Sequence, residues 1–223
     1  MKKIILPAIV FAIAAIFLGP GLFIKVKINC LSQYGSCPPQ ITDMTDSLNG
    51  KGLFYAKRRL AGILKTNYLV SAYTVQFKLP DILKVNLIVK KPVFALKDNG
   101  SGTIALVEKE GVVLAASSST DLPTIIVNEA VPPVGGSVSS ANLFALTLMR
   151  GVFKMYQTTT GNIEGDTLLV DLPGSIRVIF PLAGSDADML LGSVRLIYSN
   201  IRDDGNAKPY SQIDLRYQNP VLR

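Results

Sequence analysis

The sequence predicts an α+β protein in which two domains follow an apolar N-terminal segment. Three observations predict this class. Residues 4–24 carry no charge, residues 25–92 show strand and helix patterns in the order β-α-α-β-β, and residues 93–223 consist mainly of short strands between turn signals. A chain of 223 residues is long enough for two small domains, each with its own core.

Residues 4–24 are predicted to form a single transmembrane helix behind a cytoplasmic tail of residues 1–3. A helix of that length spans about 31 Å, similar to the hydrocarbon thickness of a bilayer. The alternative is a cleaved signal peptide. Its small-residue cleavage pattern, Ala12-Ile13-Ala14, lies in the middle of the run, so cleavage would leave an apolar stub. We therefore expect a retained anchor that contacts the lipid bilayer, with a cytoplasmic N-terminus and exported C-terminal domains.

The first exported domain, residues 25–92, is expected to bury one face of a small sheet under two helices. Its elements follow from hydrophobic periodicity. They are a strand at 24–30, a helix opening at Pro38-Pro39, a second helix at 55–66, and a hairpin of strands at 73–79 and 83–90.

The second exported domain, residues 93–223, is expected to be rich in strands, with two late helices. Gly100-Ser101-Gly102 lies between two strands and opens no helix, so it indicates a hairpin turn and not a nucleotide-binding loop. The expected elements are strands at 93–96, 103–107, 112–115 and 123–127, a helix at 140–157 capped by Ser139 or Ser140, strands at 167–171 and 175–181, a helix at 187–202, and a terminal strand.

Cys30 and Cys37 flank a short loop and suggest a local disulfide if the domain is exported. Two free thiols are the alternative. The spacing does not fit a zinc knuckle, and the chain contains no histidine to complete one.

Charge is spread unevenly along the chain. Residues 25–92 hold 11 Lys and Arg against 3 Asp and Glu, whereas residues 93–223 hold 10 against 13. A basic domain beside a bilayer could attract anionic headgroups, and an ordinary solvated face is the plain alternative. Nucleic acid is a further candidate for a basic patch, but export argues against it, so no nucleic-acid partner is expected.

The composition argues against catalysis. The absence of histidine removes the usual general base and the commonest metal ligand. No serine-nucleophile or phosphate-loop motif occurs. Asp186 and Asp188 suit a helix N-terminus, and Asp203 and Asp204 suit a turn. We expect no catalytic residue, cofactor, metal or small-molecule substrate, and interpret the chain as a binding or scaffold protein.

Three segments in order resemble the FtsQ (DivIB) family of bacterial cell-division proteins. They are residues 48–54 (LNGKGLF), residues 83–95 (LKVNLIVKKPVFA) continued by residues 107–113 (VEKEGVV), and residues 213–217 (IDLRY). The β-α-α-β-β unit is similar to the POTRA domain of that family. The chain departs from the family in its very short cytoplasmic tail, in the Cys30/Cys37 loop, and in stopping soon after Tyr217.

The resemblance implies a non-enzymatic membrane scaffold of the division septum. Members of the family recruit and regulate septal cell-wall synthesis through FtsB (DivIC) and FtsL. The family segment that contacts FtsB lies around and after the terminal tyrosine, and the matching residues here are Arg216, Tyr217, Gln218, Asn219, Pro220, Val221 and Leu222.

The terminal strand itself is expected to be the docking element. Alternation places Ile213, Leu215 and Tyr217 on one face and Asp214 and Arg216 on the other. One edge would pair with the sheet, and a partner strand could add to the free outer edge. Two other functions stay open. One is a different POTRA-type protein that binds exported chains by strand addition, and the other is a cell-wall enzyme.

Overall fold

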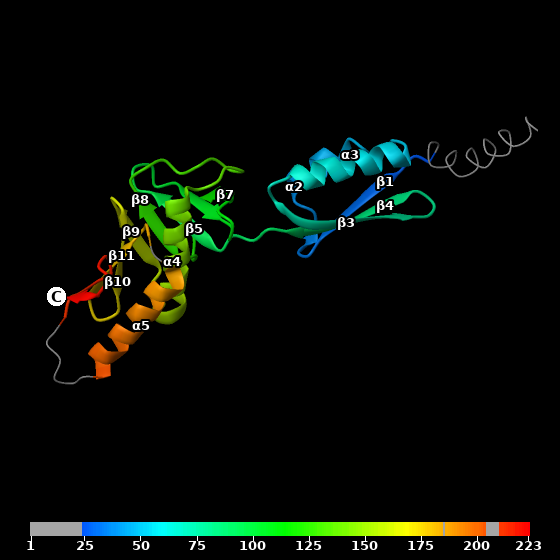
Figure 1. Cartoon of the computed structure of the whole chain (residues 1–223). Coiled ribbons are helices and arrows are strands. Elements are labelled where there is room, and N and C mark those ends of the chain that lie inside the picture. The colour runs from blue at the N-terminus through cyan, green and yellow to red at the C-terminus, as the bar shows by residue number, and fades with distance from the viewer. Residues whose placement is uncertain (1–23, 185, 204–209) are drawn as a thin grey trace, which may run out of the picture. The chain divides into compact units, whose positions relative to one another are not determined.

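The computed structural model describes residues 24–184, 186–203 and 210–223 (Figure 1). The chain divides into two compact units, Met1–Lys90 and Lys91–Arg223. The sequence analysis placed the domain boundary two residues later, after Pro92. Each unit is described by itself below.

The predicted fold class is correct as α+β, but its transmembrane helix is not found. Among the described residues, no helix is both long and apolar enough to cross a membrane. Ile24, expected to end the transmembrane helix, is instead tied into the first unit, because its carbonyl accepts a hydrogen bond of 3.0 Å from the backbone N–H of Leu53. Residues 1–23, including the expected cytoplasmic tail, lie outside the described residues.

The first unit is a four-stranded sheet with two helices on one face (Figure 1). The strand order is β2-β1-β4-β3, in which β1 runs parallel to β4 and the other neighbours are antiparallel. The elements are β1 (Lys27–Ser32), β2 (Gly35–Ser36), α2 (Pro39–Asp46), α3 (Leu53–Thr66), β3 (Val70–Lys78) and β4 (Ile82–Val89).

Alternation along the central strand explains why the helices cover one face only. Leu83, Val85 and Leu87 of β4 are buried, while the residues between them are more exposed. They meet Leu60 and Leu64, which lie one turn apart on α3. Burying a side chain of this size contributes about 1.5–3 kcal/mol, so this two-layer core is the main source of the unit's stability.

Cys30 and Cys37 are joined by a disulfide, with their Cα atoms 5.6 Å apart. The bond closes the turn between β1 and the start of α2. Cys37 belongs to the hydrophobic core of the unit, and Cys30 packs against it.

Removing this disulfide is expected to destabilise the first unit. In the chain-entropy account, a cross-link across about eight residues stabilises the fold by about 2.5 kcal/mol. The variant Cys30→Ser/Cys37→Ser should therefore show a lower free energy of unfolding, measured in urea by circular dichroism. If unreduced wild type and variant unfold at the same urea concentration, this expectation is wrong.

The second unit is built on a nine-stranded sheet of order β13-β12-β11-β10-β9-β8-β5-β6-β7. Helices α4 (Ser140–Tyr156) and α5 (Ala187–Asp203) pack against it (Figure 1). The strands are β5 (Phe94–Asp98), β6 (Ile104–Val107), β7 (Val113–Ser117), β8 (Thr124–Val127), β9 (Thr160–Glu164), β10 (Thr167–Leu172), β11 (Ile176–Pro181), β12 (Gln212–Asp214) and β13 (Val221–Leu222).

Local chemistry fixes both ends of α4 and its contact with α5. The Ser139 hydroxyl accepts a hydrogen bond of 3.1 Å from the N–H of Asn142, so Ser139 is the cap. Gln157 ends the helix in the left-handed conformation, with φ of 58°. A Cβ atom at Gly151 would overlap the side chain of Leu191, so glycine at this position lets the two helices approach closely.

Candidate partner-binding site

The C-terminal segment folds as a short hairpin at one edge of the large sheet. Strand β12 pairs in parallel with β11 and antiparallel with β13. The N–H groups of Arg223 and Gln212 each donate to the other residue's carbonyl at 3.0 Å. The outer edge of β12 is therefore already occupied by the protein's own chain.

Two parts of the sequence expectation are corrected here. The terminal strand does not run to Tyr217 but ends at Asp214, and its outer edge is not free. The reason is a turn, in which Asp214 Oδ1 accepts a hydrogen bond of 3.1 Å from the N–H of Arg216. The chain then bends through residues 216–219 and returns as β13.

Asp214 and Arg216 form a clamp at this turn. The Asp214 side chain is fully buried. Arg216 donates to both carboxylate oxygens, with Nε–Oδ1 at 2.9 Å and Nη2–Oδ2 at 2.7 Å. This fork lowers the pKa of Asp214 below its ordinary value, because hydrogen bonds from Arg216 stabilise the ionised form.

A groove of about 290 Å³ runs beside the hairpin, between it and the start of α5. Met189 is 74% exposed and Tyr217 is 53% exposed, so two large apolar side chains of the groove face solvent. The lining residues are Gly184, Asp186, Met189, Leu190 and Ser193 on one side, and Leu215, Tyr217, Gln218 and Pro220 on the other.

Asp186 holds the first turn of α5 in place at the mouth of the groove. Its Oδ1 atom accepts hydrogen bonds from the N–H groups of Asp188 at 2.8 Å and Met189 at 3.1 Å. A carboxylate at a helix N-terminus satisfies otherwise unpaired N–H groups and favours the helix dipole. Its carboxylate therefore fixes the backbone that carries Met189.

The seven residues predicted to bind a partner fall into four groups. Tyr217, Gln218 and Pro220 line the groove, and Val221 and Leu222 form β13. Arg216 holds the Asp214 turn, and Asn219 lies exposed in the bend.

Sequence reasoning missed the α5 side of the groove. The helix at 187–202 was predicted from one apolar face, formed by Leu190, Val194, Ile197 and Ile201. Met189 does not belong to that face. A large apolar residue off the stripe of an amphipathic helix was the available signal, because such a residue must face solvent or a partner.

The strand edge next to the groove offers few backbone groups. Arg223 and Gln212 form a hydrogen-bonded pair, so the N–H and C=O of Leu222, opposite Ile213, point away from β12. Pro220 has no N–H to contribute. A partner strand added here would find one outward donor, at Leu222.

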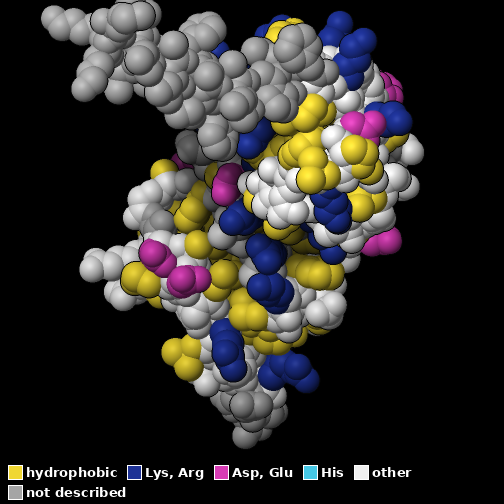
Figure 2. Space-filling view, turned by 90° about the vertical axis from the view of Figure 1, so that its right-hand side faces the viewer, with side chains coloured by type: hydrophobic (Ala, Val, Ile, Leu, Met, Phe, Trp, Pro, Cys, Tyr) yellow, Lys and Arg dark blue, Asp and Glu magenta, His cyan; other side chains and the backbone are white. Residues whose placement is uncertain are grey.

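Charged and apolar side chains are intermixed on the face seen in Figure 2. Figure 2 shows Lys and Arg side chains lying beside hydrophobic ones, with Asp and Glu sparse on the face in view. No cluster of three or more His, Cys, Asp and Glu side chains suited to a metal ion occurs in the part of the chain that the structure describes.

In comparison with known proteins, no family model matches this chain and no curated protein is significantly similar to it.

Proposed function

We propose that this protein is a non-catalytic docking scaffold that binds a partner polypeptide at the groove beside the C-terminal hairpin. The observation that carries the proposal is the pairing of exposed Met189 with exposed Tyr217 across one groove. Exposed large apolar side chains gathered in a concave site are typical of protein interfaces. At the adjacent sheet edge, the outward backbone groups of Leu222 would help to orient the partner.

We further propose that the partner is a divisome protein of the FtsB/DivIC and FtsL type, with the docking domains exported at the division septum. The ordered likeness of residues 48–54, 83–95 and 213–217 to the FtsQ/DivIB family supports this identity. The Cys30–Cys37 disulfide supports an oxidising, exported location. The proposal makes no use of a membrane helix.

The direct test is capture of the same organism's FtsB/DivIC-like protein by the purified full chain. We expect a stable complex that copurifies, and septal fluorescence when a tagged copy of the chain is expressed in that organism. Diffuse fluorescence together with failure to capture either the FtsB/DivIC-like or the FtsL-like protein would overturn the proposal.

Replacing Leu222 with Pro is expected to distinguish the contribution of the strand edge to partner affinity from that of the groove. The Leu222 N–H points outward, so proline there removes the donor available to an added strand while keeping the β12–β13 pairing. We expect partner affinity to fall about fivefold to tenfold, the equivalent of about one hydrogen bond. Val221→Pro is the matched control, because it places proline in the inward-bonded register and should destabilise the hairpin itself. Unchanged affinity in Leu222→Pro would show that the partner uses side chains only.

A feature of the first unit supports a second candidate function, the binding of an exported chain by strand addition. Strand β3 has nine residues and lies at the edge of the small sheet. A long edge strand is the element that POTRA-type proteins would use to bind an exported chain by strand addition. Loss of client binding after charge reversal on β3, with Tyr217 variants unaffected, would favour this alternative.

A further inference from the structure

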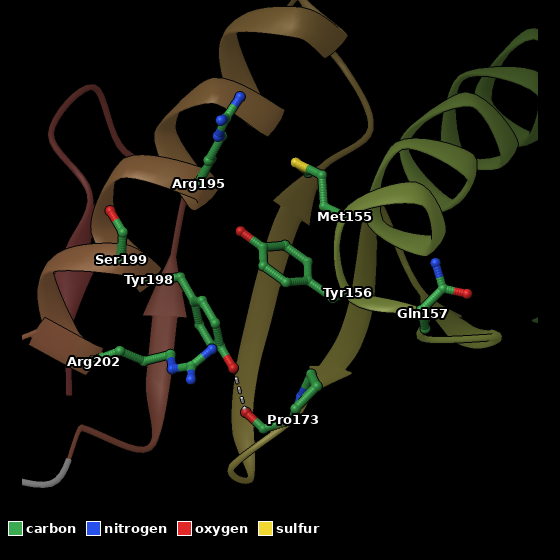
Figure 3. Close-up of a pocket in the computed structure, with 8 residues that line it drawn as sticks. All are labelled: Met155, Tyr156, Gln157, Pro173, Arg195, Tyr198, Ser199 and Arg202. Atoms are coloured by element: carbon green, nitrogen blue, oxygen red, sulfur yellow. Dashed lines mark hydrogen bonds between the residues drawn. The ribbon is translucent and has the colours of Figure 1, made fainter.

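A second groove lies in the same unit, away from the hairpin. It is formed by the end of α4, one side of α5 and the turn between β10 and β11, and its volume is about 430 Å³ (Figure 3). The lining residues are Met155, Tyr156, Gln157, Pro173, Arg195, Tyr198, Ser199 and Arg202.

Two tyrosine rings form the wall of this groove. The rings of Tyr156 and Tyr198 meet edge to face, with centroids 4.9 Å apart. The Tyr198 hydroxyl donates to the carbonyl of Pro173 at 3.0 Å, so it is already satisfied. The Arg202 guanidinium lies 5.9 Å from the centre of the Tyr198 ring, which fits a cation–π contact.

The Tyr156 hydroxyl differs from that of Tyr198. It is buried and has no hydrogen-bond partner among the described residues. Figure 3 shows it directed from the end of α4 toward α5. Burial is the main cause that raises the pKa of Tyr156, so the group is a protonated donor at neutral pH. An unsatisfied buried hydroxyl costs about 1–3 kcal/mol.

Two arginines complete the site. Arg195 and Arg202 are seven residues apart on α5, which places them on the same side of the helix, about 10 Å apart along its axis. Within residues 24–184, 186–203 and 210–223, neither is paired with a carboxylate in a salt bridge. The lining contains no acidic side chain, so the groove offers positive charge and donors without an internal counter-charge.

We propose that this groove binds an acidic polypeptide segment whose carboxylates reach Arg195 and Arg202. A spacing of about 10 Å corresponds to residues seven apart on a helix, which lie on the same helix face. Arg195, Ser199 and Arg202 are all exposed, so the site is an open trough that fits a passing chain. This surface is separate from the hairpin groove and does not depend on the function proposed there.

The spacing can be tested with two fluorescein-labelled 16-residue helical peptides of identical composition. One has glutamates seven residues apart, and the other has them adjacent. Anisotropy with the full chain at low salt should show about tenfold tighter binding of the spaced peptide. Equal affinity for both peptides would overturn the proposal, because it would indicate charge attraction without a defined site.

The site residues can be tested by charge reversal. Arg195→Glu/Arg202→Glu should weaken binding of the spaced peptide by at least about tenfold. Lys109→Glu/Lys154→Glu changes the net charge equally outside the groove, and should weaken binding less than about threefold. Equal losses in the two double variants, both folded by circular dichroism, would contradict the proposal.

Tyr156→Phe tests the buried hydroxyl that has no partner among the described residues. Removing the unsatisfied hydroxyl should raise the melting temperature of the free protein and leave peptide affinity within about twofold, because the hydroxyl is buried. A lower melting temperature would show that this hydroxyl does have a partner in the folded protein. Displacement of the peptide by millimolar inorganic phosphate, or by phosphatidylglycerol vesicles, would assign the site to a small anion or a lipid headgroup and so overturn an acidic polypeptide as the occupant.

Discussion

Replacing Tyr217 with Glu is expected to weaken capture of the proposed FtsB/DivIC-like partner by about 100-fold. Tyr217 is 53% exposed and shares the groove with Met189 and Leu215, so a glutamate would place a charge where apolar partner atoms must be buried. Aromatic side chains at the centre of an interface commonly contribute about 2–4 kcal/mol on truncation. Isothermal titration calorimetry with the purified partner measures the change directly.

Two control variants show whether the loss comes from the groove. Tyr217→Phe keeps the ring and removes only the hydroxyl, so its affinity should stay within about threefold of wild type. Leu196→Glu adds the same charge at an α5 residue that is 64% exposed but lies outside the groove lining. The proposal fails if Tyr217→Glu binds normally, or if Leu196→Glu loses as much affinity.

The melting temperature separates docking from folding. Because Tyr217 is half exposed, its replacement should leave the melting temperature of the second unit nearly unchanged. Met189→Glu should reproduce the loss of binding from the opposite wall of the groove, again with little effect on unfolding. A large drop in melting temperature in either variant would mean that the side chain supports the hairpin instead of a partner.

Elements with a strong period were predictable from the sequence. The helix expected at 140–157 is Ser140–Tyr156, because one apolar face and a capping serine define it locally. The strands expected at 167–171 and 175–181 are Thr167–Leu172 and Ile176–Pro181, which pair around a turn. In each case the information that specifies the element lies within the element.

Elements that depend on distant partners were not predictable. Strand β9 (Thr160–Glu164) has little apolar alternation and exists because β8 and β10 bind it on both sides. Strand β13 has two residues, too few for any period, and forms only because the Asp214 turn returns the chain to β12. The free edge expected on β12 was wrong for this reason.

Only one wall of the candidate groove could be predicted from the sequence, because the other wall depends on a tertiary contact. Tyr217, Gln218 and Pro220 were found because they sit in one recognisable segment. Met189 lies far from them in sequence and reaches the groove only through the packing of α5 on the sheet. A site built by two elements needs the tertiary contact before its second wall can be identified.

Replacing Asp214 with Ala is expected to lower the free energy of unfolding of the second unit by about 3 kcal/mol, through lost charged hydrogen bonds and lost packing. The buried Asp214 carboxylate accepts three hydrogen bonds from Arg216. Asp171 is the matched control, since it also forms a two-pronged pair with arginine, at 2.8 and 3.2 Å from Arg177, but in an exposed position. Asp171→Ala should cost less than about 1 kcal/mol in a urea titration at pH 7.

The same carboxylate predicts how stability responds to acid. The pKa of Asp214 is lowered in the folded protein, chiefly by the hydrogen bonds from Arg216. Its contribution is therefore present above the unfolded-state value of about 3.9 and is lost as the pH falls through the folded-state pKa. Wild type should lose stability below pH ~4 more steeply than Asp214→Ala, because the variant has no such group to protonate. Parallel slopes from pH 5 to pH 2 would contradict the clamp, and with it the structural role assigned to Arg216.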